Sequence, residues 1–308
     1  MRKTFSIILM FLCVSIHAQE LSSFVESNLL TSLQKDDKAA LLMVHFGTTY
    51  NDTRSKTIDA INKKAKAMFP QLEVRESYTS RIIMRRLKAR GIQKESPLEA
   101  MLRLRAEGYT HLIVQSTNII DGVEMESLRK DVESVKPFFK EIRVGNPLMY
   151  STDDALQVVD ILTKRIPANA KKREHVLFVG HGTVTPATAI YSEIDYMLKA
   201  EGHPNYHVGT IEGYPTFDNA VQMLKAAKAK SVTLAPLMFV AGDHAKNDIS
   251  QDWKENLEKE GFQVDLHIEG LGEIPEIQDI YLSHIQFLMQ HRVRGIMEKK
   301  AAYSTQKD

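Results

Sequence analysis

The sequence predicts an α/β protein built from two similar doubly wound domains, each with a four-stranded parallel sheet, and a cleft between them. Short, nearly continuous apolar runs alternate with amphipathic stretches, an order typical of parallel sheets covered by helices on both faces. Eight such runs occur, four in each half of the chain. The second half also repeats motifs of the first, which indicates two copies of one folding unit.

The apolar runs are the predicted strands. Their residues do not alternate between apolar and polar types, so both faces of each strand should be buried. The runs lie at 39–46, 72–77, 110–116 and 141–146 in the first half, and at 174–180, 206–212, 231–239 and 263–270 in the second.

Amphipathic helices are expected between the strands. Apolar residues recur at helical spacing from Thr53 to Met68, which predicts one helix there. The segment 96–108 begins with Ser-Pro and has a glutamate three residues after the serine, the pattern of a capping box, and it ends in glycine. Segments 185–202 and 216–230 are similar. A last helix is expected over about 274–299, with its two histidines on the surface or in packing contacts.

The repeats place the ends of equivalent strands in equivalent positions. "MVHFGTT" aligns with "FVGHGTV" at an offset of 135 residues, and "VQSTNIIDGVEME" aligns with "APLMFVAGDHAKN" at an offset of about 120. Two facing α/β halves form a cleft between the carboxyl ends of their strands, where open α/β sheets bind ligands.

Composition excludes several classes of protein. The chain has 308 residues, 43% hydrophobic and 26% charged, which is ordinary for globular domains. The formal net charge is +1, and no basic tract is interleaved with aromatic residues. A nucleic-acid-binding role is therefore not expected.

The N-terminus has the pattern of a secretory signal peptide. Residues 1–18 combine the basic "MRK", the apolar "TFSIILMFLCVSI" and Ala18 as a small residue for cleavage. An exported, periplasmic protein with no membrane span in its mature chain is expected. Lipid anchoring through Cys13 is disfavoured, because Leu12 stands where a small residue is needed.

The predicted organisation follows from these boundaries. A polar lead-in at 19–37 precedes an N-terminal α/β domain at 38–150 and a C-terminal α/β domain at 151–270, and a helix and tail occupy 271–308. Cys13 is the only cysteine, so the mature chain has none. A metal must then be held by His, Asp or Glu.

Polar side chains follow three consecutive strands of the second half. His181 ends the first of these strands, Glu212 ends the second, and His244 lies just past the third. Two imidazoles and a carboxylate suit a divalent first-row metal and leave a coordination position open. In the first half Glu124 aligns with His244, and Glu76 aligns near Glu212.

Other interpretations stay open at this point. A histidine at a strand end is more often a capping or packing residue, and Glu212 alone would suit an exposed turn. "GHGT" also suggests a phosphate loop, but no GxGxxG or GxxxxGK[ST] motif occurs. Neither a GxSxG elbow nor an HExxH motif is present.

The chain resembles the anaerobic sirohydrochlorin cobaltochelatases, of the same broad fold group as ferrochelatase, over about residues 38–292. The segments that carry the resemblance are "FGTTYNDTRSKTIDAI" (46–61), "ESYTSRIIMRRL" (76–87), "VQSTNIIDGVEME" (114–126), "VGHGT" (179–183), "IEGYPTFD" (211–218) and "PLMFVAGDHAKND" (236–248). The resemblance implies a chelatase-like fold that binds a tetrapyrrole in its cleft. It also implies insertion of Co²⁺ into sirohydrochlorin for cobalamin synthesis, and no organic cofactor.

The resemblance also implies roles for individual residues. His181, Glu212 and His244 would bind the metal, which is the substrate Co²⁺, with Fe²⁺ or Ni²⁺ as alternatives. His181, His244 and Glu124 would be the catalytic residues. An imidazole with a pKa near ~6.5 is suited to holding the ion and to accepting a pyrrole proton when it is not a ligand.

This sequence departs from the family at the cleft. Relatives carry a histidine and an asparagine after "GHGT", where this chain has Val184, Thr185 and Thr188, and the segment before Trp253 is shorter here. These changes, with the signal peptide, leave an alternative function: an exported protein that binds haem or another tetrapyrrole, or strips its iron, for uptake. The oligomeric state is open, a homo-oligomer included, and His45 is a candidate for a further haem or metal site at a subunit contact.

Overall fold

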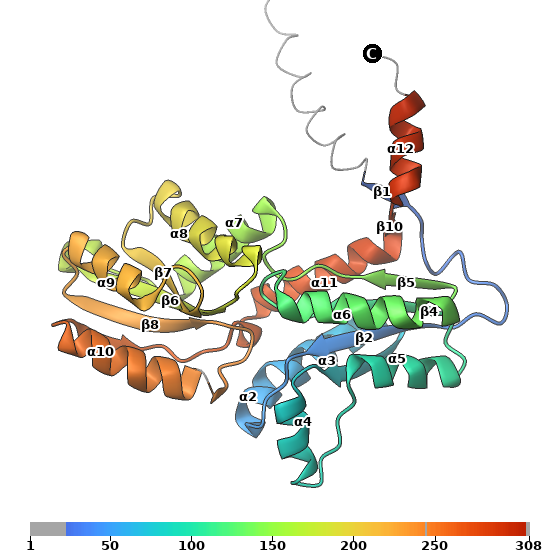
Figure 1. Cartoon of the computed structure of the whole chain (residues 1–308), viewed down its shortest axis with the longest axis horizontal. Helices are drawn as coiled ribbons and strands as arrows, with labels where there is room; N and C mark the ends of the chain where they lie inside the picture. The colour runs from blue at the N-terminus through green and yellow to red at the C-terminus, as the bar shows by residue number, and fades with distance from the viewer. Residues whose placement is uncertain (1–22, 244, 306–308) are drawn as a thin grey trace, which may run out of the picture.

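Two parallel sheets form the framework of the computed structural model, which describes residues 23–243 and 245–305. The predicted signal segment, with Cys13, and the predicted ligand His244 lie outside these described residues. The first sheet has the order β3-β2-β4-β5 and the second has the order β7-β6-β8-β9 (Figure 1). The strands are β2 (Ala39–His45), β3 (Glu73–Tyr78), β4 (His111–Ser116), β5 (Glu141–Val144), β6 (Glu174–Gly182), β7 (Tyr206–Glu212), β8 (Ser231–Leu237) and β9 (Gln263–Leu266).

The predicted fold class is confirmed. All pairs within the two four-stranded sheets are parallel, and the eight predicted strands are the eight strands of these two sheets. In each sheet the first strand lies between the second and the third, so the chain winds outward in both directions from it. The carboxyl ends of β2 and β4, and of β6 and β8, are therefore the switch points where α/β sheets bind ligands.

Helices cover both faces of each sheet. In the first half they are α2 (Asn51–Lys56), α3 (Ile58–Met68), α4 (Arg81–Lys88), α5 (Pro97–Ala106), α6 (Val123–Val135) and the 3₁₀ turn η1 (Lys136–Phe138). The second half has α7 (Thr152–Arg165), η2 (Ala170–Lys172), η3 (Pro186–Thr188), α8 (Ala189–Ala200), α9 (Phe217–Ala226), the π-helix η4 (Ala245–Trp253), α10 (Lys254–Lys259), η5 (Leu271–Glu273), α11 (Pro275–Gln290) and α12 (Ile296–Thr305).

The single helix predicted over Thr53–Met68 is wrong, because the helix breaks at Thr57. This residue has φ −112° and ψ −80°, and its hydroxyl donates to the Thr53 carbonyl at 2.6 Å. A threonine hydroxyl that bonds four residues back bends a helix. The periodicity of the apolar residues continues across the bend, which is why the sequence shows one helix where the structure has two.

The single helix predicted over 274–299 is also wrong. The observed helix α11 ends at Gln290. The next residues, His291–Val293, form the short strand β10, which pairs antiparallel with β1 (Phe24–Glu26). The Gln290 carbonyl accepts from the Ser27 N–H at 2.8 Å. The helix end is thus satisfied by a segment far away in the sequence, which helical periodicity cannot reveal.

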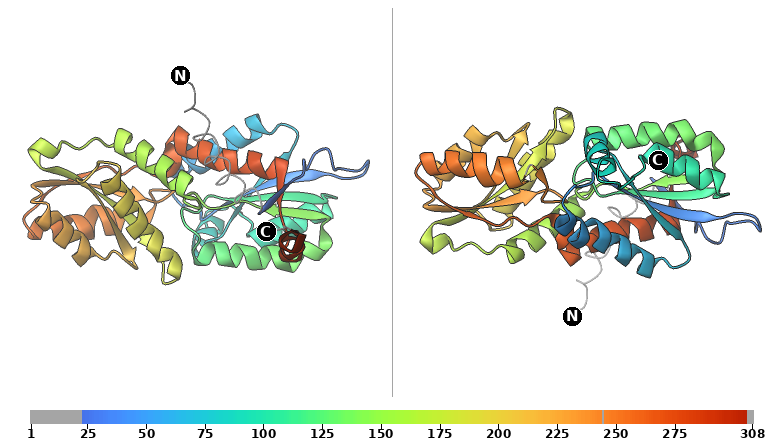
Figure 2. Two further views of the ribbon diagram at one scale, coloured as in Figure 1. Left: turned by 90° about the horizontal axis from the view of Figure 1, so that it is seen from above. Right: turned by 90° about the horizontal axis from the view of Figure 1, so that it is seen from below.

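One continuous apolar core joins the two halves. It runs from the β2–β4 face of the first sheet through α3, α7 and α11 to the β6–β8 face of the second sheet and α8. The outer faces have their own cores, one under α5 and α6 and one under α9, η4 and α10. Figure 2 shows α11 lying along the first sheet although it follows the second in sequence. The Tyr281 hydroxyl of α11 donates to the Thr117 and Asn118 carbonyls, both at 3.0 Å, which anchors the helix behind the switch point of the first sheet.

Among the described residues, none of the helices combines the length and the apolar character needed to cross a membrane.

Candidate functional site

A cavity of about 460 Å³ opens between the two halves at the carboxyl ends of their strands. Its walls come from the segments after β2, β4, β6 and β8, from the start of α4 and α6, and from the last residue of β7. This is the position that the doubly wound topology of both sheets predicts for a ligand. The cavity is the structural counterpart of the cleft expected from the repeats.

His181 and Glu212 lie on neighbouring strands and both line this cavity, where Glu212 is exposed. β6 and β7 pair so that Gly182 stands opposite Glu212. Gly182 has φ +86°, and the Glu212 carbonyl oxygen lies 1.4 Å from the place where a Cβ would stand. Only glycine permits this backbone conformation and this approach of the two strand ends. The second glycine of "GHGT", Gly182, therefore allows the cavity residues His181 and Glu212 to be neighbours.

The tautomer of His181 follows from its local hydrogen bond. Its Nδ1 lies 3.2 Å from the Gly182 carbonyl oxygen, which can only accept. Nδ1 is then the protonated ring nitrogen, and Nε2 carries the lone pair that can bind a metal. The side chain is half-buried and lines the cavity.

Glu124 faces the same cavity from the other half. It is half-buried in the first turn of α6, where the N-terminal end of the helix dipole favours a negative charge. The structure thus places His181, Glu212 and Glu124 around one cavity. Within the described part of the chain, however, no three His, Cys, Asp or Glu side chains come close enough to hold a metal ion. The fourth predicted residue, His244, lies outside that part.

Glu76 does not reach the cavity, although the repeats align it near Glu212. It lies two residues before the end of β3, whereas Glu212 is the last residue of β7. Its carboxylate accepts from the Asn62 amide at 2.7 Å and forms an ion pair with Lys94. The sequence alignment of Glu76 with Glu212 therefore does not match equivalent positions of the two strands.

His45 is not a surface ligand, and the idea that it serves a subunit contact is wrong. It is 1% exposed, with Nδ1 3.0 Å from the Thr117 hydroxyl and Nε2 3.0 Å from the Asn62 carbonyl oxygen. The Asn62 amide is already turned toward Glu76, so its oxygen accepts from Nε2–H, and Nδ1 accepts from Thr117. Burial lowers the pKa of His45 to about 4, against the opposing effect of Glu76. His45 is thus a neutral histidine with both nitrogens in use.

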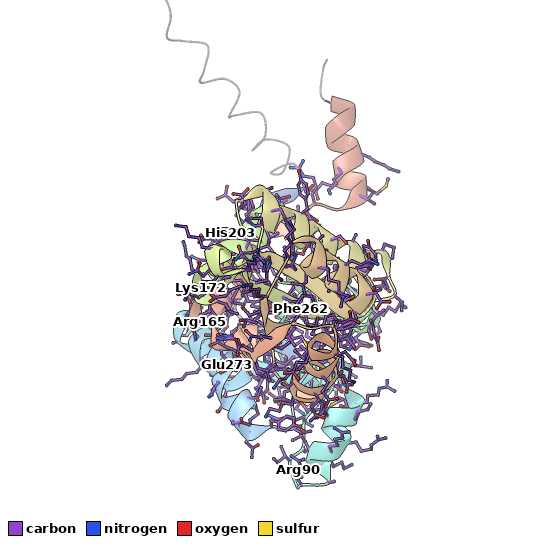
Figure 3. The ribbon with its side chains drawn as sticks, turned by 90° about the vertical axis from the view of Figure 1, so that its left-hand side faces the viewer. Arg90, Arg165, Lys172, His203, Phe262 and Glu273 are labelled. Atoms are coloured by element: carbon purple, nitrogen blue, oxygen red, sulfur yellow. The ribbon has the colours of Figure 1, made fainter. Side chains whose placement is uncertain are left out.

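The cavity rim carries a contact between the halves that the sequence did not suggest. Asp243, which follows β8, accepts from the Tyr50 hydroxyl at 2.8 Å and from Arg86 Nη1 of α4 at 2.7 Å. The hydrogen bond to Asp243 raises the pKa of Tyr50. At the far end of the α4 segment, Arg90 donates to the Thr49 carbonyl at 2.8 Å and lies at the lower edge of the molecule in Figure 3.

The Arg86–Asp243 pair is half-exposed, with 52% and 43% of the two side chains accessible to solvent. Ion pairs with this much solvent around them contribute about 0–1 kcal/mol to stability. The contact therefore joins the two halves at the rim without locking them.

Four large apolar side chains that line the cavity are exposed. Val184 is 90% accessible to solvent, Ile82 54%, Val123 48% and Phe46 40%. Exposed apolar side chains gathered at one cavity indicate a binding site for a ligand with apolar surfaces. Because they come from both halves, such a ligand would contact both.

Thr188, one of the residues that depart from the family pattern, joins two loops. The Thr188 hydroxyl donates to the Tyr214 carbonyl at 3.3 Å and accepts from the Tyr214 N–H at 3.2 Å. This joins the loop after β6 to the loop after β7. The segment before Trp253 is the π-helix η4, and the buried Trp253 ring packs edge-on against Phe217 with 5.1 Å between centroids.

Comparisons with known proteins agree with this architecture. The family model described as "Cobalt chelatase (CbiK)" matches residues 39–290. The chain is 37% identical over 253 residues to a sirohydrochlorin cobaltochelatase of Salmonella typhimurium, covering 80% of this chain and 95% of the relative. It is 33% identical over 254 residues to the sirohydrochlorin cobaltochelatase CbiKC of Nitratidesulfovibrio vulgaris, covering 80% and 89%.

Solved structures show the same fold at lower identity. SirB from Bacillus subtilis, determined with Fe³⁺, superposes with a TM-score of 0.58 at 15% identity over 82% of this chain and 96% of SirB. At this identity the likeness concerns the fold alone. The resemblance read from the sequence is nevertheless confirmed by the family match and the two relatives, and with it the expectation of a metal chelatase. The chain belongs to the cobalt chelatase (CbiK) family.

Proposed function

We propose that this protein is a sirohydrochlorin cobaltochelatase, which inserts Co²⁺ into the ring and releases two pyrrole protons. The observation that carries the proposal is the cavity between the halves, which combines His181, Glu212 and Glu124 with exposed apolar side chains from both halves. A tetrapyrrole has apolar ring faces and nitrogen donors at its centre, so it needs apolar walls and a metal held beside them.

In the proposed mechanism His181 and Glu212 deliver the metal. The Nε2 of His181 is the ligating nitrogen, since Nδ1 is bonded to the Gly182 carbonyl. Glu212 supplies a carboxylate that offsets part of the charge of the ion. His244 is proposed as a third ligand because it follows the next strand in the sequence. Ligands of this kind accept Co²⁺, and also Fe²⁺ and Ni²⁺, so we propose that supply decides among these metals.

Proton removal is assigned to the cavity groups that are not ligating at that moment. Glu124 lies in the first turn of α6 on the opposite side of the cleft from His181. It can take up a proton or pass it to solvent, because it is only half-buried. Each N–H bond that breaks gives its proton to a protein base while the nitrogen pair binds the metal. We propose no organic cofactor for this reaction.

The experiment is an anaerobic absorbance time course with protein, sirohydrochlorin and Co²⁺, compared with the same mixture without protein. The proposal predicts conversion of the ring spectrum to the cobalt complex well above the spontaneous rate. Conversion no faster than the spontaneous rate, although the ring binds, would contradict it and favour the alternative of an exported haem-binding or tetrapyrrole-binding protein.

We also propose that the protein is exported to the periplasm, on the support of the basic and apolar pattern of residues 1–18. Cell fractionation with N-terminal sequencing of the purified protein tests this. A mature chain beginning after Ala18 in the periplasmic fraction is expected, and an intact Met1 in the cytoplasmic fraction would contradict it. The homo-oligomer stays a proposal that light scattering of the same preparation tests.

A further inference from the structure

The rim of the cavity holds a carboxylate between two donors from the opposite half. Asp243 belongs to the segment after β8, while Tyr50 precedes α2 and Arg86 lies on α4. The Tyr50 hydroxyl donates to Oδ1 at 2.8 Å, and Arg86 Nη1 donates to Oδ2 at 2.7 Å. Each oxygen of the carboxylate thus has its own donor. The structure itself shows that this pair of side chains fits a carboxylate.

The same donors face the ligand cavity. Tyr50, Arg86 and Asp243 all line it, together with the acidic Glu124 and Glu212. Among the described residues that line the cavity, Arg86 is the one lysine or arginine. A carboxylate on a ligand in this cavity would therefore find its matching charge at Arg86, at the position that Asp243 now fills.

We propose that Tyr50 and Arg86 form a binding subsite for a peripheral carboxylate of the tetrapyrrole, and that Asp243 fills this subsite until the ring enters. The inference rests on the proposed function, because sirohydrochlorin carries carboxylate side chains around the edge of its ring. It adds to that function a pair of residues that orient the ring and a carboxylate that competes with it.

The exchange preserves the hydrogen bonds of the two donors, Tyr50 and Arg86. One carboxylate replaces another on the same hydroxyl and guanidinium, so each donor keeps a charged acceptor. The half-exposed Asp243 returns to water rather than to an apolar environment. The displaced Asp243 then gives up its contact with α4, while Lys246, 3.8 Å over the Tyr50 ring, and the bond from the Thr53 hydroxyl to the Ala241 carbonyl still join the two halves.

Neighbouring charges favour the approach of a ligand with many carboxylates. α4 also carries Arg81, Arg85 and Lys88, and no described carboxylate lies within ion-pair distance of these three side chains. Exposed cations beside a cavity raise the local concentration of an anionic ligand. These residues would act on the rate of association, whereas Tyr50 and Arg86 would hold the bound ring.

The test is a fluorescence titration of the full protein with uroporphyrin, a metal-free ring with eight carboxylates. Arg86→Gln and Tyr50→Phe should each weaken binding by about tenfold, the loss expected for one hydrogen bond to a charged group. Asp243→Ala should instead tighten binding several-fold, since it removes the competitor, and this gain should vanish in the Arg86→Gln background. The matched control is Arg103→Gln, because Arg103 is an exposed arginine paired with Glu95 away from the cavity.

The results separate the two proposals. If Arg86→Gln and Tyr50→Phe bind the ring as tightly as wild type does, the inference about the subsite is overturned while the proposed function stands. An Asp243→Ala variant that binds the ring more weakly than wild type would also overturn it, because Asp243 would then support the site rather than compete for it. Failure of the wild-type protein to bind the ring would contradict the proposed function itself.

Discussion

The carbonyl oxygen of Glu212 lies 1.4 Å from the point where a Cβ on Gly182 would stand. No side chain fits there, so the ends of β6 and β7 approach each other beside the cavity only because residue 182 is a glycine. The proposed ligands His181 and Glu212 depend on this approach. The spacing of the two strand ends is thus set by one residue of the "GHGT" motif.

Gly182→Ala should therefore destabilise the protein far more than its backbone conformation alone requires. Gly202 has the same φ of +86° with nothing within 4 Å of its Cβ position, which makes Gly202→Ala the matched control. The control should lose about 1–2 kcal/mol from left-handed backbone strain. Gly182→Ala should lower the free energy of unfolding by at least ~2 kcal/mol more than the control does, because β7 must also move. Urea unfolding measures both, and equal losses would contradict the account.

The buried, neutral side chain of His45 should make the folded protein less stable in acid. Burial lowers the pKa of His45 from 6.5 to about 4. Below pH 6.5 the unfolded chain takes up a proton that the folded chain refuses until about pH 4, so stability falls across this window. The shift corresponds to about 3 kcal/mol.

Urea unfolding of wild type and His45→Gln between pH 7 and pH 4 checks this effect. The variant removes the titrating group but keeps an amide that can bond Thr117 or Asn62. Its stability should fall less steeply than that of wild type between pH 6.5 and pH 4. Parallel curves would show that His45 does not titrate in this window.

Val184 should serve binding rather than folding. Its side chain is 90% exposed at the cavity, so Val184→Ser should leave stability within about 0.5 kcal/mol of wild type. If the bound ring covers the Val184 side chain, the substitution should weaken ring binding by up to about tenfold. This corresponds to roughly 1.5 kcal/mol from burying the apolar surface of the valine. Titration with a metal-free porphyrin beside thermal unfolding distinguishes the two effects. Unchanged affinity would place the ring elsewhere in the cavity.

The sequence predicted the sheets well because burial on both faces leaves a direct trace in composition. The strands β2, β4, β6 and β8 are apolar runs buried along most of their length, whereas β3, β5 and β9 carry charged residues and are partly exposed. The repeat of motifs showed that the halves are alike. His181 and Glu212 were predicted from their positions at strand ends and Glu124 from its alignment with His244, and the structure places all three at the cavity. Their roles as ligands or bases remain proposals.

The features that the sequence did not predict depend on contacts between distant segments. The rim contact joins Asp243 to Tyr50 and Arg86, which are 193 and 157 residues away. The end of α11 depends on pairing with β1. The helix α4 was missed as well, although Ser80 caps it by accepting from the Ile83 N–H at 3.4 Å. A serine before a basic amphipathic segment was the available sign.

The central claim is that His181 and Glu212 hold the metal that enters the ring. The most direct measurement is the initial rate of Co²⁺ insertion into sirohydrochlorin by wild type, His181→Ala and Glu212→Gln. His203→Ala is the control, because His203 packs edge-on against Tyr206 at 5.6 Å and does not line the cavity. The account predicts a loss of about 100-fold or more for the two cavity variants, at unchanged ring affinity, and none for the control. Rates for His181→Ala and Glu212→Gln equal to that of His203→Ala would contradict it.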